Sequence, residues 1–169
     1  SPLFRTVSGF QTTRLAQMCA RCVKKAGTER RIKMNDNIKL TRTWQDPHCF
    51  QITFECENDL ISAKAKVYLS EQNLDEFTKM INLFVEDPAI STEYAFGERG
   101  NRFAPAVEFL IQQKDALGHI LIEVYMEIND GGSLDTHHCC FFVATELGLL
   151  QQFGIKVQTL KRPDLGTSA

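Results

Sequence analysis

The sequence predicts an α+β domain with a mainly antiparallel sheet of about six strands and two helices packed on one face. Two observations predict this class. Segments with alternating apolar residues follow one another across short turns, and two segments with helical spacing come after the third and the last of them. Parallel pairing would require long crossover connections, which are missing between consecutive strands. The predicted order is therefore β-β-β-α-β-β-β-α.

The strands before the first helix are predicted from alternation. The stretch that opens with Ile38 is extended and ends at the turn Asp46-Pro47. Apolar and polar residues then alternate through Cys49–Glu57 and again through Ile61–Leu69. We expect these two segments to form an antiparallel hairpin across Asn58-Asp59, which has turn chemistry.

The first helix is predicted over Leu74–Phe84, because the apolar residues of this segment recur every three or four positions. Asn73 would be its N-cap, with Glu76 three residues later. Asp87-Pro88 should end the helix, since a residue before proline avoids the helical region. A loop or short strand through Tyr94–Phe96 follows.

Three strands and a second helix complete the predicted domain. Alternation predicts two long central strands, Val107–Gln113 and His119–Ile128. A further strand, His137–Val143, is predicted beyond the loop Asn129–Ser133. Thr145 would then cap a helix that carries Leu147, Leu150 and Phe153. Residues 161–169 show no periodicity, and we expect a loose tail there.

The charge of the chain is distributed unevenly. Of 19 basic and 21 acidic residues, eight basic residues and one acidic residue lie in 1–33, which leaves 11 basic and 20 acidic residues for 34–169. An acidic domain repels phosphate backbones, so we expect no nucleic-acid partner for 34–160 and favour a protein partner with a basic surface. No apolar run approaches the ~18 residues of a membrane span, so we expect no membrane partner.

The basic segment 1–33 is interpreted as a leader outside the fold, and 34–160 as a single α+β domain. Three readings of the leader remain open: a targeting segment, a nucleic-acid or membrane-surface arm, and sequence before the natural start. We favour the third, because Met34 opens a stretch typical of a domain start. Cys19 and Cys22 form a C-x-x-C without a second pair, and we favour chance placement on a short helix.

Six cysteines in a chain without an apolar signal segment indicate a reducing compartment, so we expect thiols and a cytoplasmic location. His137, His138, Cys139 and Cys140 form the densest group of metal-capable residues. Alternation on a strand puts at most two of them on each face, so a metal would need distant ligands. The candidates for those ligands are Cys49, Cys56 and His119.

Core packing of Cys139-Cys140 before two phenylalanines is the favoured interpretation of this segment, and metal binding or thiol catalysis is the alternative. Glu108, Glu123 and Glu127 could supply a carboxylate pair for hydrolysis, but we favour a solvated sheet face. The chain has no G-x-S-x-G, P-loop, G-x-G-x-x-G or H-E-x-x-H motif. We therefore assign no catalytic residue, no metal ligand and no cofactor.

The order of features from Trp44 to Leu160 resembles the WapI-type bacterial immunity proteins and related uncharacterised small bacterial proteins. The stretches that carry the resemblance are Trp44-Gln45-Asp46, Val67-Tyr68-Leu69 before the first helix, Gly118–Val124, and Phe142–Leu150 with Phe153-Gly154. The resemblance implies a non-catalytic protein that binds and neutralises a cognate toxin domain in the bacterial cytoplasm. It carries over no individual binding residue.

The leading hypothesis is thus an immunity-like binding protein that acts by protein-protein contact. The alternatives are a small enzyme, a metal-dependent or thiol-dependent protein that uses His137–Cys140, and a homo-oligomeric module with an open edge strand.

Overall fold

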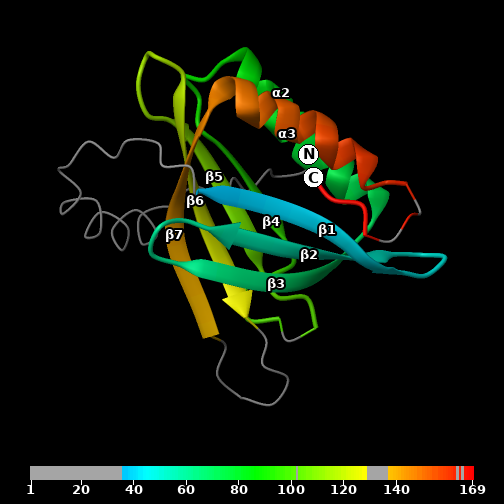
Figure 1. Cartoon of the computed structure of the whole chain (residues 1–169). Coiled ribbons are helices and arrows are strands. Elements are labelled where there is room, and N and C mark those ends of the chain that lie inside the picture. Colours follow the sequence, from blue (N-terminus) through cyan, green and yellow to red (C-terminus); the bar gives the residue numbers. More distant parts are fainter. Residues whose placement is uncertain (1–35, 102, 129–136, 163, 165) are drawn as a thin grey trace, which may run out of the picture. The chain divides into compact units, whose positions relative to one another are not determined.

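The computed structural model describes residues 36–101, 103–128, 137–162, 164 and 166–169, all of which belong to one unit, Ile32–Ala169 (Figure 1). The predictions for the leader 1–33, for Cys19 and Cys22 and for the loop Asn129–Ser133 lie outside the described residues.

The first three strands form an antiparallel sheet in the order β1 (Asn37–Gln45), β2 (Phe50–Glu57) and β3 (Ser62–Leu69). Side-chain oxygens hold its two turns. Asp46 Oδ1 accepts from the main-chain nitrogens of the two residues at the β1–β2 turn, at 2.7 and 2.8 Å. Asn58 Oδ1 does the same at the β2–β3 turn, at 2.9 Å for each bond. The predicted hairpin is confirmed, with Phe54 opposite Ala65.

The other four strands form a second antiparallel sheet in the order β4 (Thr92–Phe96), β5 (Val107–Gln113), β6 (His119–Ile128) and β7 (His137–Glu146). The α+β class with antiparallel pairing is confirmed. The described part of the chain has seven strands instead of about six, because β4 pairs with β5, and they divide into two sheets of three and four strands.

The first described helix, α2 (Glu71–Glu86), begins earlier than predicted. Its N-cap is Ser70, and Asn73 occupies the third helical position, where its Oδ1 accepts from Ser70 N at 2.9 Å. The expected N-cap at Asn73 was therefore wrong, since the amide side chain reaches back to the cap instead of starting the helix. The predicted end is confirmed, because Asp87 is the C-cap.

The second described helix, α3 (Leu147–Thr159), also begins at a different cap. Thr145 still belongs to β7, where it pairs with Ile120, and Glu146 is the N-cap. The expected cap at Thr145 was wrong because β7 keeps its pairing with β6 up to the first turn of the helix. α3 lies beside α2 (Figure 1), and at Gly154 an added Cβ would be 3.0 Å from Ile81 Cγ2.

One core joins the two sheets and the two helices. Phe77 on α2 is 2% exposed, and its ring centroid lies 5.0 Å from that of Phe96 and 5.4 Å from that of Phe109. Phe54 from the three-stranded sheet lies 5.0 Å from Phe96, which brings β2 and β4 together. Phe153 on α3 completes the cluster at 6.3 Å from Phe77. Both helices thus pack on the aromatic inner side of the four-stranded sheet.

The end of the chain is tied to β1 instead of being loose. Leu40 and Ala169 exchange two main-chain hydrogen bonds, at 3.0 and 2.9 Å. Arg42 is 6% exposed, and its Nη1 donates to Leu160 O at 2.8 Å and to Arg162 O at 2.9 Å. The expectation of a loose tail was wrong here, because these bonds join main-chain groups to each other or to the side chain of Arg42 and leave no trace in the periodicity of residues 161–169.

Candidate functional site

The four residues of the predicted metal-capable segment lie on β7 and divide between its two faces. His138 stacks on Tyr125 of β6, with 5.6 Å between ring centroids, and the Cys140 thiol lies 3.5 Å from Glu123 Oε1. Cys139 points the other way and packs against the core. The alternation predicted from the sequence thus separates His138 and Cys140 from Cys139.

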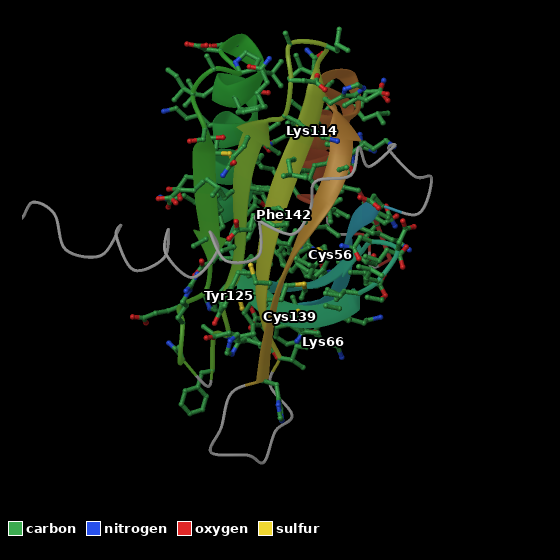
Figure 2. The ribbon with its side chains drawn as sticks, turned by 90° about the vertical axis from the view of Figure 1, so that its left-hand side faces the viewer. Cys56, Lys66, Lys114, Tyr125, Cys139 and Phe142 are labelled. Carbon is green, nitrogen blue, oxygen red and sulfur yellow. The ribbon has the colours of Figure 1, made fainter. Side chains whose placement is uncertain are left out.

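The distant residues considered as further ligands lie in three different places. Cys56 is buried on β2, near Cys139 of the other sheet (Figure 2). The Cys49 thiol lies 3.8 Å from Asp46 Oδ2 at the β1–β2 turn, and His119 Nδ1 lies 2.6 Å from Asp115 Oδ2 at the β5–β6 turn. Among the described residues, no three His, Cys, Asp or Glu side chains converge on a point where they could hold a metal ion.

The environment of these thiols disfavours nucleophilic chemistry. Burial, followed by the charge of Cys139, raises the pKa of Cys56 to about 12. Burial also raises the pKa of Cys139, and desolvation and the Asp46 carboxylate raise the pKa of Cys49. A reactive cysteine needs a lowered pKa, because the thiolate is the nucleophile. These three thiols are therefore protonated at neutral pH and suited to packing.

The three candidate carboxylates on the outer side of the four-stranded sheet are held by structural partners. Glu108 receives both Arg99 Nε, at 2.6 Å, and Arg99 Nη2, at 2.5 Å. That hydrogen-bonded pair raises the pKa of Arg99, whose guanidinium also lies 3.9 Å from the Tyr125 ring centroid. Glu123 faces the Cys140 thiol. Glu108 and Glu123 are thus both engaged by neighbouring side chains.

Glu127 departs from the expected solvated sheet face, because it is only 4% exposed. Its carboxylate accepts from Gly100 N at 3.0 Å and from Ala106 N at 3.1 Å, and the Tyr125 hydroxyl donates to it at 3.2 Å. Burial and the charge of Glu127 raise the pKa of Tyr125 to about 12. Glu127 therefore fastens the loop between β4 and β5, a role that alternation along β6 cannot reveal.

The free edge of β7 is partly occupied by side chains from elsewhere in the domain. Asn58 Nδ2 donates to Phe142 O at 2.8 Å, and Asp36 Oδ2 accepts from Ala144 N at 2.7 Å. Both main-chain groups would otherwise be available to an added strand. Pairing of a second chain along this edge would have to displace both side chains, which disfavours β7 as an open edge for oligomerisation.

The solvent side of α2 carries several exposed carboxylates and a single lysine. We call it the α2 acidic face. Its carboxylates project from the exposed half of the helix and its C-cap, around the exposed side chains of Leu83 and Ile90. The carboxylates of this face are Glu71, Asp75, Glu76, Glu86 and Asp87.

Two of these carboxylates are held in place by neighbouring elements. Lys161, just beyond α3, donates to Asp75 Oδ1, and this bond lowers the pKa of Asp75. The Tyr94 hydroxyl on β4 donates to Glu76 Oε2 at 3.1 Å. Lys79 is the single basic residue of the helix. The α2 acidic face is therefore partly preorganised and clearly negative.

The C-terminal end of α2 places charge against the helix dipole. The last turn contains Glu86 and no basic residue, and Asp87 follows as the C-cap. The helix dipole already makes this end negative, so each carboxylate there costs roughly 0.3–1 kcal/mol of helix stability. Leu83 and Ile90, 52% and 62% exposed, lie at the same end. This end of α2 thus combines unfavourable charge with two exposed apolar side chains.

Comparison with protein-family models, with curated proteins and with solved structures finds no match. The helices described here include none long and apolar enough to cross a membrane. The observations that bear on the function of this chain are therefore the charges and exposed apolar residues of its surface. The acidity of the domain and the buried side of α2 were both predicted from the sequence, but the acidic outer side of this helix was not. The signal was present, since Glu71, Asp75 and Glu86 fall on one side of a helical wheel.

Proposed function

We propose that this chain is a non-catalytic bacterial binding protein of the immunity type, which neutralises a basic toxin domain in the cytoplasm through the α2 acidic face. The observation that carries the proposal is the C-terminal end of α2, where Glu86 and Asp87 stand between exposed Leu83 and exposed Ile90 in the chain. A basic partner would relieve the repulsion at this end and cover the apolar side chains.

Electrostatics and packing support different parts of such an interaction. A negative surface accelerates encounter with a positive one and fixes its orientation, whereas buried apolar residues at the centre supply most of the affinity. The α2 acidic face has both components, with Leu83 lying among the carboxylates. Its backbone is a helix packed through Phe77 and Ile81, so little ordering should be required on binding.

The proposal predicts a toxin gene directly in front of the gene of this chain, and it is tested by co-expressing the chain with the toxin domain of that neighbour. We expect growth to be restored, and the two purified proteins to form a stable complex. Growth arrest that the chain does not relieve, together with no complex, would overturn the proposal.

A pair of exposed leucines supplies matched variants for the same assay. Leu83→Asp places a charge at the exposed apolar residue of the α2 acidic face, and we expect it to abolish rescue. Leu117→Asp makes the same change at the β5–β6 turn, where Leu117 is 84% exposed, and we expect it to retain rescue. Equal behaviour of the two variants would show that the partner binds elsewhere.

A further inference from the structure

The edge strands of the two sheets differ in what covers them. The end of the chain bonds to β1 at Leu40 and Arg42, and the side chains of Asn58 and Asp36 bond to the edge of β7. β3 lies at the other edge of the three-stranded sheet (Figure 1). Within the described parts of the chain it pairs with β2 alone, and no loop or side chain bonds to the main chain on its other side. Ser62–Leu69 therefore forms an open edge of eight residues.

The main chain of an open edge can pair with another strand. Every second residue of an antiparallel edge strand directs its N–H and C=O away from its one neighbour, where an extended chain can bond to them. Peptides that bind in this way gain affinity from the main-chain hydrogen bonds, and the flanking side chains determine which peptide is selected. The main chain of β3 thus supplies donors and acceptors, and its side chains supply selectivity.

The solvent-facing side chains of β3 are mainly basic. Lys64, Lys66 and Tyr68 alternate on the exposed side of the strand, and the residues between them are buried. Lys64 bonds to Glu55 of β2 at 2.5 Å. Lys66 lies opposite uncharged Thr53 and makes no ion pair with a described residue. A carboxylate on an added strand would therefore be the cross-strand counter-charge that β2 does not give to Lys66.

The same lysines disfavour a second copy of this chain as the added strand. The antiparallel registers that pair most of β3 with its copy put Lys64 opposite Lys66, or Lys66 opposite Lys66. Like charges directly opposite each other destabilise a strand pair. Lysines on an edge strand thus oppose self-association, and they leave pairing with an acidic strand available.

We infer that the free edge of β3 binds an extended peptide segment with carboxylates at alternate positions, which adds to the three-stranded sheet as a further strand. Its main chain would pair with β3, and its carboxylates would lie opposite Lys64 and Lys66. β4, an edge of the other sheet, is five residues long and carries exposed Glu93, so it does not offer the same charge. This inference goes beyond the proposed function and does not depend on it, since it uses β3 instead of the α2 acidic face and a partner of opposite charge.

The test titrates capped peptides as long as β3 into the isotopically labelled full chain. In one peptide glutamate alternates with valine, and in its counterpart lysine replaces glutamate. The glutamate peptide should shift the amide resonances of β3 in a saturable way and protect alternate amides of this strand from hydrogen exchange. The lysine peptide should bind at least about tenfold more weakly, because its charges would face those of β3.

Two N-methylated forms of the glutamate peptide test the main-chain bonds. One form is methylated at every glutamate and the other at every valine, so each has one blocked edge. One of them should lose binding and the other should keep it, because a strand bonds to β3 along only one of its edges. Retention of binding by both forms, equal binding of the glutamate and lysine peptides, no binding of the glutamate peptide, or shifts confined to other strands would overturn the inference. Self-association that protects β3 without peptide would also overturn it and make the second copy the occupant.

Two exposed lysines provide the matched variants, since Lys66→Glu and Lys79→Glu change the net charge equally. Lys66→Glu should weaken binding of the glutamate peptide at least about tenfold and strengthen binding of the lysine peptide. Lys79→Glu on α2 should leave both affinities within about twofold. Equal effects of the two variants would show a response to overall charge and would overturn the assignment of the β3 edge.

Discussion

The two helices lie side by side on the same core, yet their solvent sides differ in chemistry (Figure 1). α2 carries four carboxylates and one lysine, whereas α3 carries no carboxylate and one lysine. The exposed side of α3 instead presents Leu149 and Ile155, 53% and 67% exposed. Packing constrains only the buried side of each helix. Of the two helices, α2 alone combines a cluster of carboxylates with an exposed apolar residue on its outer side.

The largest expected effect concerns the buried side of α2. Phe77→Ala should lower the free energy of unfolding by about 3–5 kcal/mol, because the ring is almost fully buried among other aromatic rings. Leu83→Ala, on the exposed side of the same helix, should change it by less than about 0.5 kcal/mol. Urea denaturation of both variants measures the contrast. A similar loss of unfolding free energy in both variants would contradict the assignment of Phe77 to the buried side and Leu83 to the exposed side of α2.

The second effect concerns how the helices end. The last carbonyls near the end of α3 accept from buried Arg42, whereas the last turn of α2 has no basic residue. Arg42→Leu should destabilise the domain by about 2–3 kcal/mol, since Leu160 O and Arg162 O would lose a charged donor. Arg42→Lys keeps the charge and should lose less. Denaturation curves that rank the two variants in the opposite order would contradict this role.

The third effect concerns the contact between the helices. Gly154→Val should destabilise by about 1–3 kcal/mol, because the new side chain would overlap Ile81. Gly148 is the internal control, since an added Cβ there meets no atom within 4 Å. Gly148→Ala should stabilise α3 by up to about 1 kcal/mol. Thermal unfolding distinguishes the two glycines, and a stable Gly154→Val variant would place the helices farther apart than described.

The smallest effect concerns the ion pair that joins the two helices. Lys161 lowers the pKa of Asp75 below its usual value near 3.8, so the pair stabilises the fold above that pH and the contribution is lost as pH falls through the lowered pKa. Asp75→Asn should therefore have a melting temperature that falls less on acidification below about pH 4 than that of the parent chain. Parallel melting curves of the two proteins over this range would show that the pair contributes nothing.

Sequence periodicity predicted the fold where one repeating pattern dominates. Alternation defined β5 and β6 to the residue, and helical spacing defined the buried side of α2. The predictions were wrong where the hydrogen bonds of a single side chain determine a helix start or the burial of a residue. Ser70 is the N-cap because Asn73 bonds back to it, and Glu127 is buried because loop amides point at it. Such contacts depend on local geometry, whereas a period of two or 3.6 residues indicates only which face of a strand or helix a side chain lies on.

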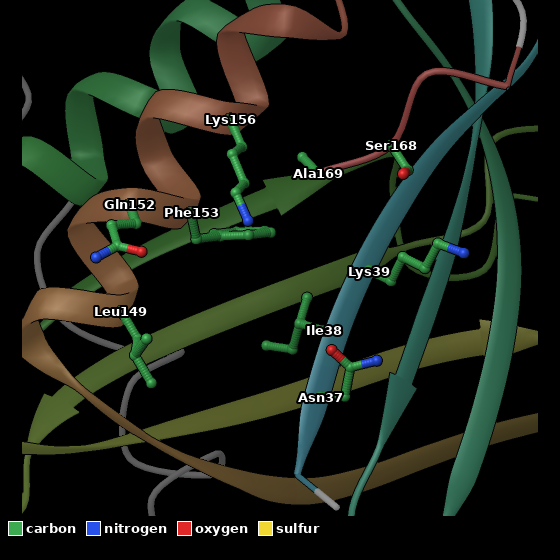
Figure 3. Close-up of a pocket in the computed structure, with 9 residues that line it drawn as sticks. All are labelled: Asn37, Ile38, Lys39, Leu149, Gln152, Phe153, Lys156, Ser168 and Ala169. Atoms are coloured by element: carbon green, nitrogen blue, oxygen red, sulfur yellow. The ribbon is translucent and has the colours of Figure 1, made fainter. Parts of the chain in front are cut away.

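The candidate surfaces were harder to predict than the elements that carry them. The sequence drew attention to His137–Cys140 because metal-capable residues are adjacent there, yet adjacency on β7 separates side chains onto opposite faces. The carboxylates of the α2 acidic face are instead spread over 17 positions of the sequence, and they come together on one side only because the segment is a helix. The hollow lined by residues 37–39, 149–156 and 168–169 (Figure 3) combines three segments that no linear pattern joins.

We propose that the acidic end of α2 contacts a basic partner, and affinity for the toxin domain that this proposal expects beside the gene tests it most directly. Glu86→Lys and Glu57→Lys are matched, because both glutamates are exposed and each change shifts the net charge by the same amount. Glu86→Lys should weaken binding about tenfold at low salt, mainly through slower association, and the loss should shrink as salt is added. Glu57→Lys, on the three-stranded sheet, should have little effect. Equal affinities of the two variants at every salt concentration would contradict the claim.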